Sequence, residues 1–201
     1  MSDLVPTADS LMVLSFLPGP GPFIMGILNV TPDSFSDGGL YTDTTAALAQ
    51  AQRMIAEGAD IIDVGGESTR PPGATYGAGA ERISESEECA RVLPVIKAIR
   101  TISATIPISI DTQHASVARE ALAAGATIIN DVSAGTTDPD ILGVAAKAGV
   151  PLILMHGHGP LFDRPAIEEY HYEDVVTSVK TYLGGRITAA RTAGVKEILA
   201  D

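Results

Sequence analysis

From Phe23 onward the sequence repeats one unit: a short apolar segment, a polar loop, a segment with helical spacing and, in most units, a glycine. Apolar runs without water-facing positions are typical of parallel strands that helices cover. The repeat therefore predicts an α/β fold in which strands and helices alternate. The predicted strands are residues 24–28, 60–64, 107–111, 127–131, 151–156 and 197–201.

The intervening segments carry the start and stop signals of helices. Ser84 with Glu87 resembles a capping box, and Pro94 inside that segment predicts a kink or a late helix start. Thr112 is expected to cap the next helix, and Asp138 followed by Pro139 is expected to open the one after it. The predicted helices are residues 43–57, 84–103, 113–124, 138–148 and 173–193, with glycines closing most of them.

Two architectures fit such an alternation, an open doubly wound sheet and a barrel. Residues 29–32 read Asn-Val-Thr-Pro, where a dinucleotide-binding sheet would carry its glycine-rich turn. A barrel has eight strands and typically ~250 residues, whereas six strands are predicted in 201 residues. The sequence therefore predicts a (β/α)8 barrel that is C-terminally incomplete. Residues 1–22 are expected to form an N-terminal lead or hairpin, and residues 23–201 the barrel domain.

The composition argues against several classes of protein: nucleic-acid-binding, membrane-spanning and secreted. The formal net charge is −12, so the phosphate backbone of a nucleic acid would be repelled. The single cysteine, Cys89, permits no intrachain disulfide, and no apolar run reaches the ~18 residues that a membrane span needs. The first residues contain no Lys or Arg, unlike a secretory signal. We therefore expect a cytoplasmic protein with neither nucleic-acid nor membrane partners.

A polar residue stands at or near the end of each predicted strand. In a parallel sheet or barrel these ends share one edge, which is where ligands bind. The alternative is that each residue merely ends its strand and caps the next helix. Because carboxylates and carboxamides recur in succession, we favour a site. The residues are Asn29, Asp63, Asp111, Asn130 with Asp131, His156 and Asp201.

The residue types indicate what such a site could bind. Asp111, Asn130 and Asp201 come from different strands and could hydrogen-bond the N–H and NH2 groups of a flat nitrogen heterocycle. Arg70, in a loop bounded by glycines, could hold an anionic group or instead form a solvated salt bridge.

Two other chemistries are weaker alternatives. His156 and His158 form a His-x-His at a strand end, but zinc or iron would need about two further ligands. His114 and His171 are the other histidines, at a helix start and in a loop. The sequence has no Gly-x-Ser-x-Gly, which argues against a nucleophilic triad.

Five sequence blocks resemble dihydropteroate synthases, in order and at suitable spacing: residues 25–39, 63–71, 109–112, 129–132 and 154–156. The resemblance implies a (β/α)8 barrel transferase of folate synthesis. Such an enzyme joins para-aminobenzoate to 6-hydroxymethyl-7,8-dihydropterin diphosphate, with Mg2+, and releases 7,8-dihydropteroate and diphosphate. It also implies competition by sulfonamides and a homodimer at full length.

The resemblance assigns roles to individual residues. Asp111, Asn130 and Asp201 resemble the pterin-recognising strand ends, with Met155 beside the ring. Asn29 resembles the catalytic residue near the metal and the diphosphate. Two loops are expected to close over the reacting centre and shape the aminobenzoate pocket. Their residues are Asp33 and Phe35 in the first loop and Thr69, Arg70 and Pro71 in the second, with Asp33 and Arg70 in catalytic roles.

The chain also departs from that family. The Gly-rich turn after the sixth strand, the Ser-Arg-Lys of the seventh and the Arg-x-His of the eighth have no counterpart, and residues 157–164 differ from the usual loop. We therefore predict that these 201 residues alone are inactive or weakly active. A pterin-binding module of the methyltetrahydrofolate methyltransferase type and a degenerate, non-catalytic relative are the alternatives.

Overall fold

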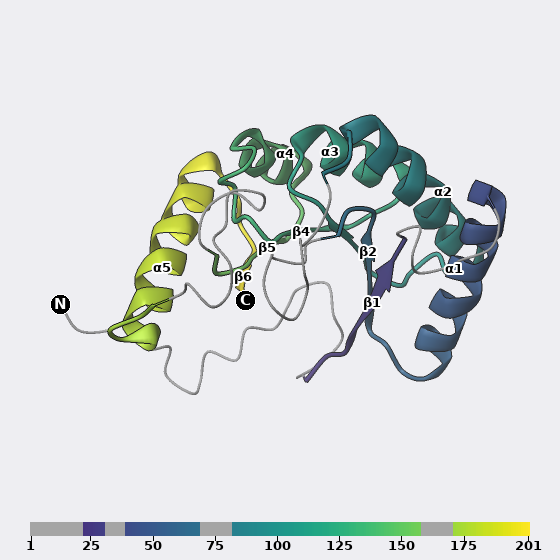
Figure 1. Cartoon of the computed structure of the whole chain (residues 1–201), viewed down its shortest axis with the longest axis horizontal. Coiled ribbons are helices and arrows are strands. Elements are labelled where there is room, and N and C mark those ends of the chain that lie inside the picture. The colour runs from purple at the N-terminus through teal and green to yellow at the C-terminus, as the bar shows by residue number, and fades with distance from the viewer. Residues whose placement is uncertain (1–21, 31–38, 69–81, 158–170) are drawn as a thin grey trace.

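The computed structural model describes residues 22–30, 39–68, 82–157 and 171–201. Strands and helices alternate throughout this part of the chain (Figure 1). The predicted N-terminal lead falls almost wholly outside the described residues, so its form stays a prediction. The strands are β1 (Met25–Asn29), β2 (Ile61–Gly65), β3 (Ile108–Asp111), β4 (Ile128–Asp131), β5 (Leu152–Leu154) and β6 (Ile198–Ala200). The helices are α1 (Gly39–Ala56), α2 (Glu85–Ile102), α3 (Ala115–Ala124), α4 (Asp140–Ala148) and α5 (Val175–Ala193).

The six strands form one sheet, and every neighbouring pair is parallel. Their order in the sheet, β1-β2-β3-β4-β5-β6, is their order in the sequence. A doubly wound sheet would reverse its strand order at a switch point, whereas a barrel wall adds strands in sequence. The predicted fold class is confirmed: the described part of the chain is a run of βα units with barrel topology.

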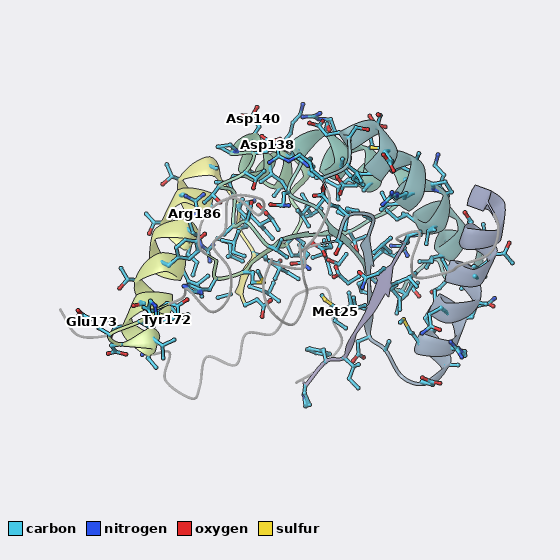
Figure 2. All side chains as sticks on the ribbon, in the orientation of Figure 1. Met25, Asp138, Asp140, Tyr172, Glu173 and Arg186 are labelled. Carbon is cyan, nitrogen blue, oxygen red and sulfur yellow. The ribbon has the colours of Figure 1, made fainter. Side chains whose placement is uncertain are left out.

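The two faces of this sheet differ. The helices lie along one side of it (Figure 1), and that helix-covered face holds the main core. Alternate residues point to the other side, which we call the inner face. It carries a small apolar cluster of Ile61, Ile128 and Ile153, and Figure 2 shows Met25 pointing from β1 toward the centre of the molecule. None of the described helices combines the length and apolar character that a membrane crossing requires.

The structure confirms the predicted cap of helix α2, but the helix does not start late, at Pro94. Ser84 accepts a hydrogen bond from the backbone N–H of Glu87 at 3.2 Å. The Glu87 carboxylate accepts from Arg91 at 2.6 Å, one turn further along. The helix runs without interruption past Pro94, which lies on its exposed side. There the carbonyl that Pro94 cannot pair is able to bond water, so the helix is not broken.

The prediction that Thr112 caps α3 is wrong. Its hydroxyl accepts from the N–H of His114 at 3.2 Å, and the helix begins only at Ala115. The N–H of Ala115 donates to Asp138 at 2.8 Å, and the other oxygen of Asp138 accepts from Asp140 at 3.1 Å. One carboxylate therefore serves the first turns of both α3 and α4, which no local pattern could indicate.

Candidate ligand-binding site

The ends of the first four strands lie level with one another. Parallel pairing aligns Asn29 with Gly65, Gly65 with Asp111 and Asp111 with Asn130. Because side chains alternate along a strand, the three polar side chains of this row project from the inner face. The prediction that these residues share one end of the sheet is confirmed for Asn29, Asp111 and Asn130.

Gly65 sits at the middle of the row and leaves room for its neighbours. A Cβ atom built on Gly65 would lie 3.3 Å from Oδ2 of Asp111 and 3.4 Å from Oδ1 of Asn29. The two side chains therefore approach each other above the glycine backbone. A larger residue at this position would have to displace both of them.

Asp63 lies one layer deeper on the same face; the sequence predicts it among the strand ends of the site but assigns it no individual role. Its side chain is 3% exposed, and it is level with Ser109 on the next strand. The carboxamide nitrogen of Asn130 donates to Oδ2 of Asp63 at 3.1 Å. Its position two residues before Gly65, on the same side of the strand, was the signal that could have revealed it.

Burial makes this group of carboxyls weakly acidic. Burial raises the pKa of Asp63, although the side chains of Ser109 and Asn130 partly offset that effect. The pKa of Asp111 is raised well above its ordinary value by burial first and then by the nearby carboxylates, Asp63 and Glu88 foremost. Within the described part of the chain, Oδ1 of Asp111 and Oδ1 of Asn130 have no hydrogen-bond partner. The site therefore has buried acceptors to which a ligand's N–H groups could donate.

Asp131 does not belong to this site, in contrast to our interpretation of the strand ends. It follows Asn130 directly, so it faces the helix-covered side, where it is fully buried. One of its oxygens accepts from the N–H and the hydroxyl of Ser133, and the other accepts from the N–H of Gly135 at 2.6 Å. Asp131 builds the turn after β4, and Arg186 of α5 donates to the carbonyls of Ala134 and Gly135 in that turn (Figure 2).

The ends of β5 and β6 are joined through their backbones. The N–H of His156 donates to the carbonyl of Asp201 at 2.8 Å, and the N–H of Asp201 donates to the carbonyl of Leu154 at 2.9 Å. The Asp201 side chain is exposed, and Met155 is half-buried. Both residues thus lie at the predicted edge of the sheet, but within the described part of the chain their side chains make no hydrogen bond to the row of Asn29, Asp111 and Asn130.

His156 packs against aromatic rings. Its ring centroid is 5.1 Å from that of Tyr182, edge to face, and 6.0 Å from that of Tyr172. Among the residues that the structure describes, no group of three His, Cys, Asp or Glu side chains could hold a metal ion. His158 lies outside them, so the His-x-His alternative gains no support from this part of the chain. Asp33, Phe35, Thr69, Arg70 and Pro71 also lie outside the described residues.

A chain of hydrogen bonds connects the loops behind the strand ends. Glu67, after β2, accepts from Gln113, after β3, at 3.4 Å. Gln113 in turn accepts from the hydroxyl of Thr137, after β4, at 2.8 Å. The second oxygen of Glu67 accepts from the N–H of Ile83 at 3.1 Å, which fixes the backbone just before α2. These contacts fix three successive loops relative to one another.

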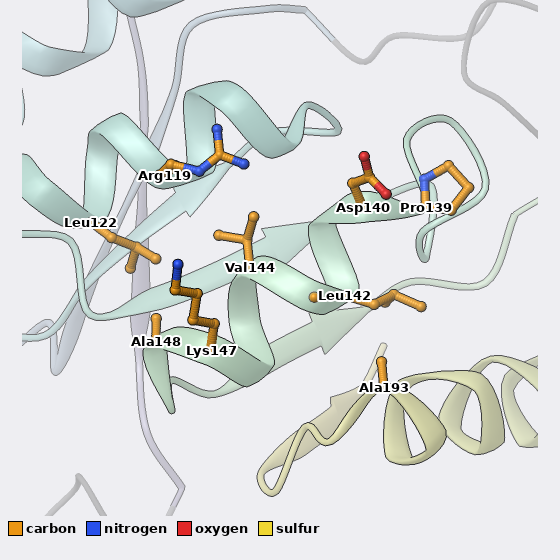
Figure 3. A pocket seen from close by; sticks show the side chains of 10 residues that line it. Arg119, Leu122, Pro139, Asp140, Leu142, Val144, Lys147, Ala148 and Ala193 are labelled. Atoms are coloured by element: carbon orange, nitrogen blue, oxygen red, sulfur yellow. The ribbon is translucent and has the colours of Figure 1, made fainter.

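A separate hollow of about 730 Å³ opens on the helical layer (Figure 3). Its walls come from α3, α4 and the end of α5, so the sheet separates it from the inner face. It is therefore not the site that the strand ends form. Its lining residues are Arg119, Leu122, Pro139, Asp140, Leu142, Gly143, Val144, Lys147, Ala148 and Ala193.

Sequential parallel strands and a polar row on the inner face define a (β/α)-barrel protein with a ligand site at the carboxyl ends of its strands. A family model described as "Pterin binding enzyme" matches residues 25–201. The chain belongs to this pterin-binding enzyme family.

Its relatives agree with that assignment. Over 185 residues the chain is 44% identical to a dihydropteroate synthase of Synechocystis sp., an alignment that covers 91% of this chain and 61% of that protein. A structure of Xanthomonas albilineans dihydropteroate synthase with 4-aminobenzoic acid matches with a TM-score of 0.77 and 45% identity, covering 90% of this chain and 60% of the other. A Yersinia pestis dihydropteroate synthase in a sulfonamide drug complex matches with a TM-score of 0.76 and 41% identity, over 90% and 62% of the two chains. The chain thus spans about three fifths of these relatives.

Proposed function

We propose that the complete protein is a dihydropteroate synthase and that this chain supplies its pterin-recognising part. The observation that carries the proposal is the row of Asn29, Asp111 and Asn130 around Gly65, with buried acceptors facing the inner side. Relatives named dihydropteroate synthase, similar over 86–91% of this chain, support it.

The acceptors suit a pterin ring. Asp111 and Asn130 each present an oxygen without a partner in the described part of the chain. The pyrimidine side of a pterin carries a ring N–H beside an exocyclic NH2, a pair of donors that matches two such oxygens. We propose that Asp201 completes the polar rim and that Met155 packs against the ring.

The reaction would then run as a substitution at the methylene carbon of 6-hydroxymethyl-7,8-dihydropterin diphosphate. The amine nitrogen of para-aminobenzoate forms a bond to that carbon, the carbon–oxygen bond breaks, diphosphate leaves, and the amine loses a proton to solvent. The carboxyls near the pterin, Asp63 and Asp111 among them, would stabilise positive charge that develops on the ring. The arylamine needs positioning more than deprotonation.

The donor chemistry at Asn29 is compatible with Mg2+. This ion commonly binds one or two protein oxygens and completes its shell with water and substrate phosphates, so a dedicated cage is not required. Asn29 is exposed at the rim, with Oδ1 directed over Gly65 beside Asp111. When bound there, Mg2+ would supply positive charge for the diphosphate oxygens.

We further propose that two loops beyond the described residues complete the centre. Asp33 and Phe35 would close over the reacting carbon from the first loop. Thr69, Arg70 and Pro71 would shape the aminobenzoate pocket, with Arg70 binding anionic oxygen. Because the net charge is −12, such local donors would have to hold the anionic substrate against the overall field.

A pterin-binding module of the methyltetrahydrofolate methyltransferase type is the second candidate, because the description of the matched family, "Pterin binding enzyme", names no particular reaction. A methyl carrier has no need of a diphosphate site. Titration of the protein with the pterin diphosphate and, separately, with methyltetrahydrofolate distinguishes the two. Binding of methyltetrahydrofolate in preference to the pterin diphosphate would overturn our proposal.

Turnover provides the direct test. Purified protein of these 201 residues is expected to be inactive or weakly active, and the complete protein, extended to the relatives' length, is expected to form dihydropteroate and to be inhibited by sulfonamides. Normal turnover by the 201-residue chain alone would contradict the first expectation. We also expect the complete protein to be a cytoplasmic homodimer, which sedimentation and cell fractionation would check.

A further inference from the structure

Glu88 is a buried carboxyl group that the proposed reaction does not use. It lies in the first turns of α2 with 1% of its surface exposed. Its helix packs closely on the end of β2, since a Cβ built on Gly66 would lie 3.2 Å from Cγ of Glu88 and 3.3 Å from its carbonyl oxygen. Neither carboxyl oxygen has a hydrogen-bond partner among the described residues. A group this costly to bury calls for an explanation.

The polar group that faces Glu88 is the hydroxyl of Thr112. Thr112 is the residue after Asp111, and its own N–H donates to the carbonyl of Asn130 at 3.0 Å. Thr112 is 3% exposed, and its hydroxyl also accepts from the N–H of His114. Whatever fixes Thr112 therefore fixes the backbone of both Asp111 and Asn130.

We propose that Glu88 is a positioning residue: through Thr112 it holds the ends of β3 and β4 so that Asp111 and Asn130 face the pterin together. This inference rests on the proposed pterin site. Glu88 itself lies behind the sheet, on the helix-covered side, and acts through its neighbour and not on the substrate.

The charges around Glu88 make this positioning depend on pH. Burial, with Glu67 and Glu85 as smaller contributions, raises the pKa of Glu88 to about 7, while Thr112 and Arg91 oppose the rise. The neutral acid can donate a hydrogen bond and does not repel its neighbours. The ionised form is repelled by Glu67 and Glu85 and attracts the Thr112 hydroxyl, so ionisation changes how Glu88 holds the end of β3. The titratable and charged groups facing Glu88 are Glu67 after β2, Glu85, Cys89 and Arg91 on α2, and Asp111 on β3.

An NMR titration tests the inference without a ligand. The side-chain NH2 signals of Asn130 should shift with a midpoint near pH 7 in the wild type, and this step should vanish in Glu88→Gln, which keeps the shape and cannot ionise. Glu87→Gln, a change at the exposed neighbour, is the matched control and should retain the step. The inference is overturned if the step persists unchanged in Glu88→Gln or is absent from the wild type.

A binding titration with the pterin diphosphate adds the functional readout. The wild type should bind roughly fivefold more weakly at pH 8 than at pH 6, the change expected over this range when binding raises a pKa of about 7 by one unit. Glu88→Gln should bind with nearly equal affinity at both values. Absence of pterin binding at every pH would count against the proposed function, and the NMR comparison would still decide the role of Glu88. Equal pH dependence in wild type and Glu88→Gln would refute the inference.

Discussion

The helix-covered face and the inner face of the sheet come from the same strands but are built for different purposes. On the helix-covered face, residues such as Ile62, Ile110 and Ile129 are fully buried among helix side chains. On the inner face, the apolar cluster around Ile61 gives way toward the strand ends to Asp63, Asp111 and Asn130. Apolar burial stabilises the first face, whereas the second keeps buried polar atoms that have no hydrogen-bond partner among the described residues.

The contrast teaches that neighbouring residues in one strand can differ completely in what they contribute. Asn130 belongs to the site, while Ile129 and Asp131 on either side of it belong to the packing and to a turn. Substitutions one residue apart should therefore separate stability from binding.

Removing a side chain from the helix-covered face should cost the most. Ile110→Ala is expected to lower the free energy of unfolding by about 2 to 5 kcal/mol, because the cavity lies in a fully buried core. Ile27→Ala is the matched control on the inner face, where that side chain is 63% exposed, and it should cost far less. Urea unfolding of both variants measures the difference. Equal losses would show that the two faces are not energetically distinct.

The buried carboxyl group of Glu88 should make the free energy of unfolding depend on pH. As pH rises, the unfolded chain releases the Glu88 proton near pH 4.5, whereas the folded protein keeps it until about pH 7. The contribution of Glu88 to stability therefore falls across this window and stays constant above it. The wild type should lose about 3 kcal/mol more than Glu88→Gln between these values. Urea unfolding at a series of pH values measures the loss, and parallel curves for the two proteins would contradict it.

A change in the polar row should affect binding and spare the fold. Asp111→Asn is expected to weaken binding of the pterin diphosphate by about 2 kcal/mol, because an acceptor oxygen of the carboxyl group is replaced by an N–H. Its urea midpoint should not fall, because burial and Asp63 already disfavour the carboxylate. Calorimetric titration and urea unfolding report the two quantities separately. A loss of stability as large as that of Ile110→Ala would show that Asp111 serves mainly to stabilise the fold.

Removing the carboxylate of Asp138, which caps both α3 and α4, should have the smallest effect on stability and none on ligand binding. Asp138→Ala removes the acceptor that serves Ala115 and Asp140, and we expect a loss of about 1 kcal/mol of unfolding free energy. Asp138→Asn keeps one acceptor oxygen and should recover part of that loss. Pterin affinity should be unchanged in both variants, as isothermal titration would show. A clear loss of affinity would mean that the caps also position the site.

Much of this arrangement could be predicted because it follows from local pattern. Buried strands read as apolar runs, and the terminal positions of Asn29, Asp111 and Asn130 followed from the ends of those runs. The prediction for Asp131 was wrong because its position along the strand does not tell which face of the sheet it occupies. A shift of one residue moves a side chain to the other face.

What could not be predicted depends on residues distant in sequence. Asp138 reaches Ala115 across 23 positions, and Asn130 reaches Asp63 across 67. Glu88 read as an ordinary residue of a capped helix start, because nothing local indicates that the end of β2 covers it. Such contacts appear only when strand register fixes which loops meet.

If the proposed pterin site is correct, the hydrogen bond from Asn130 to Asp63 has a consequence for which bicyclic rings bind there. One N–H of the Asn130 side chain donates to Asp63, which fixes the orientation of the amide, and its carbonyl oxygen has no partner among the described residues. A lumazine, which carries a carbonyl in place of the pterin's amino group, would bring an oxygen lone pair against that of Asn130 and should bind more weakly than a pterin. Selectivity between these two bicyclic rings would thus originate in a carboxylate that neither of them touches.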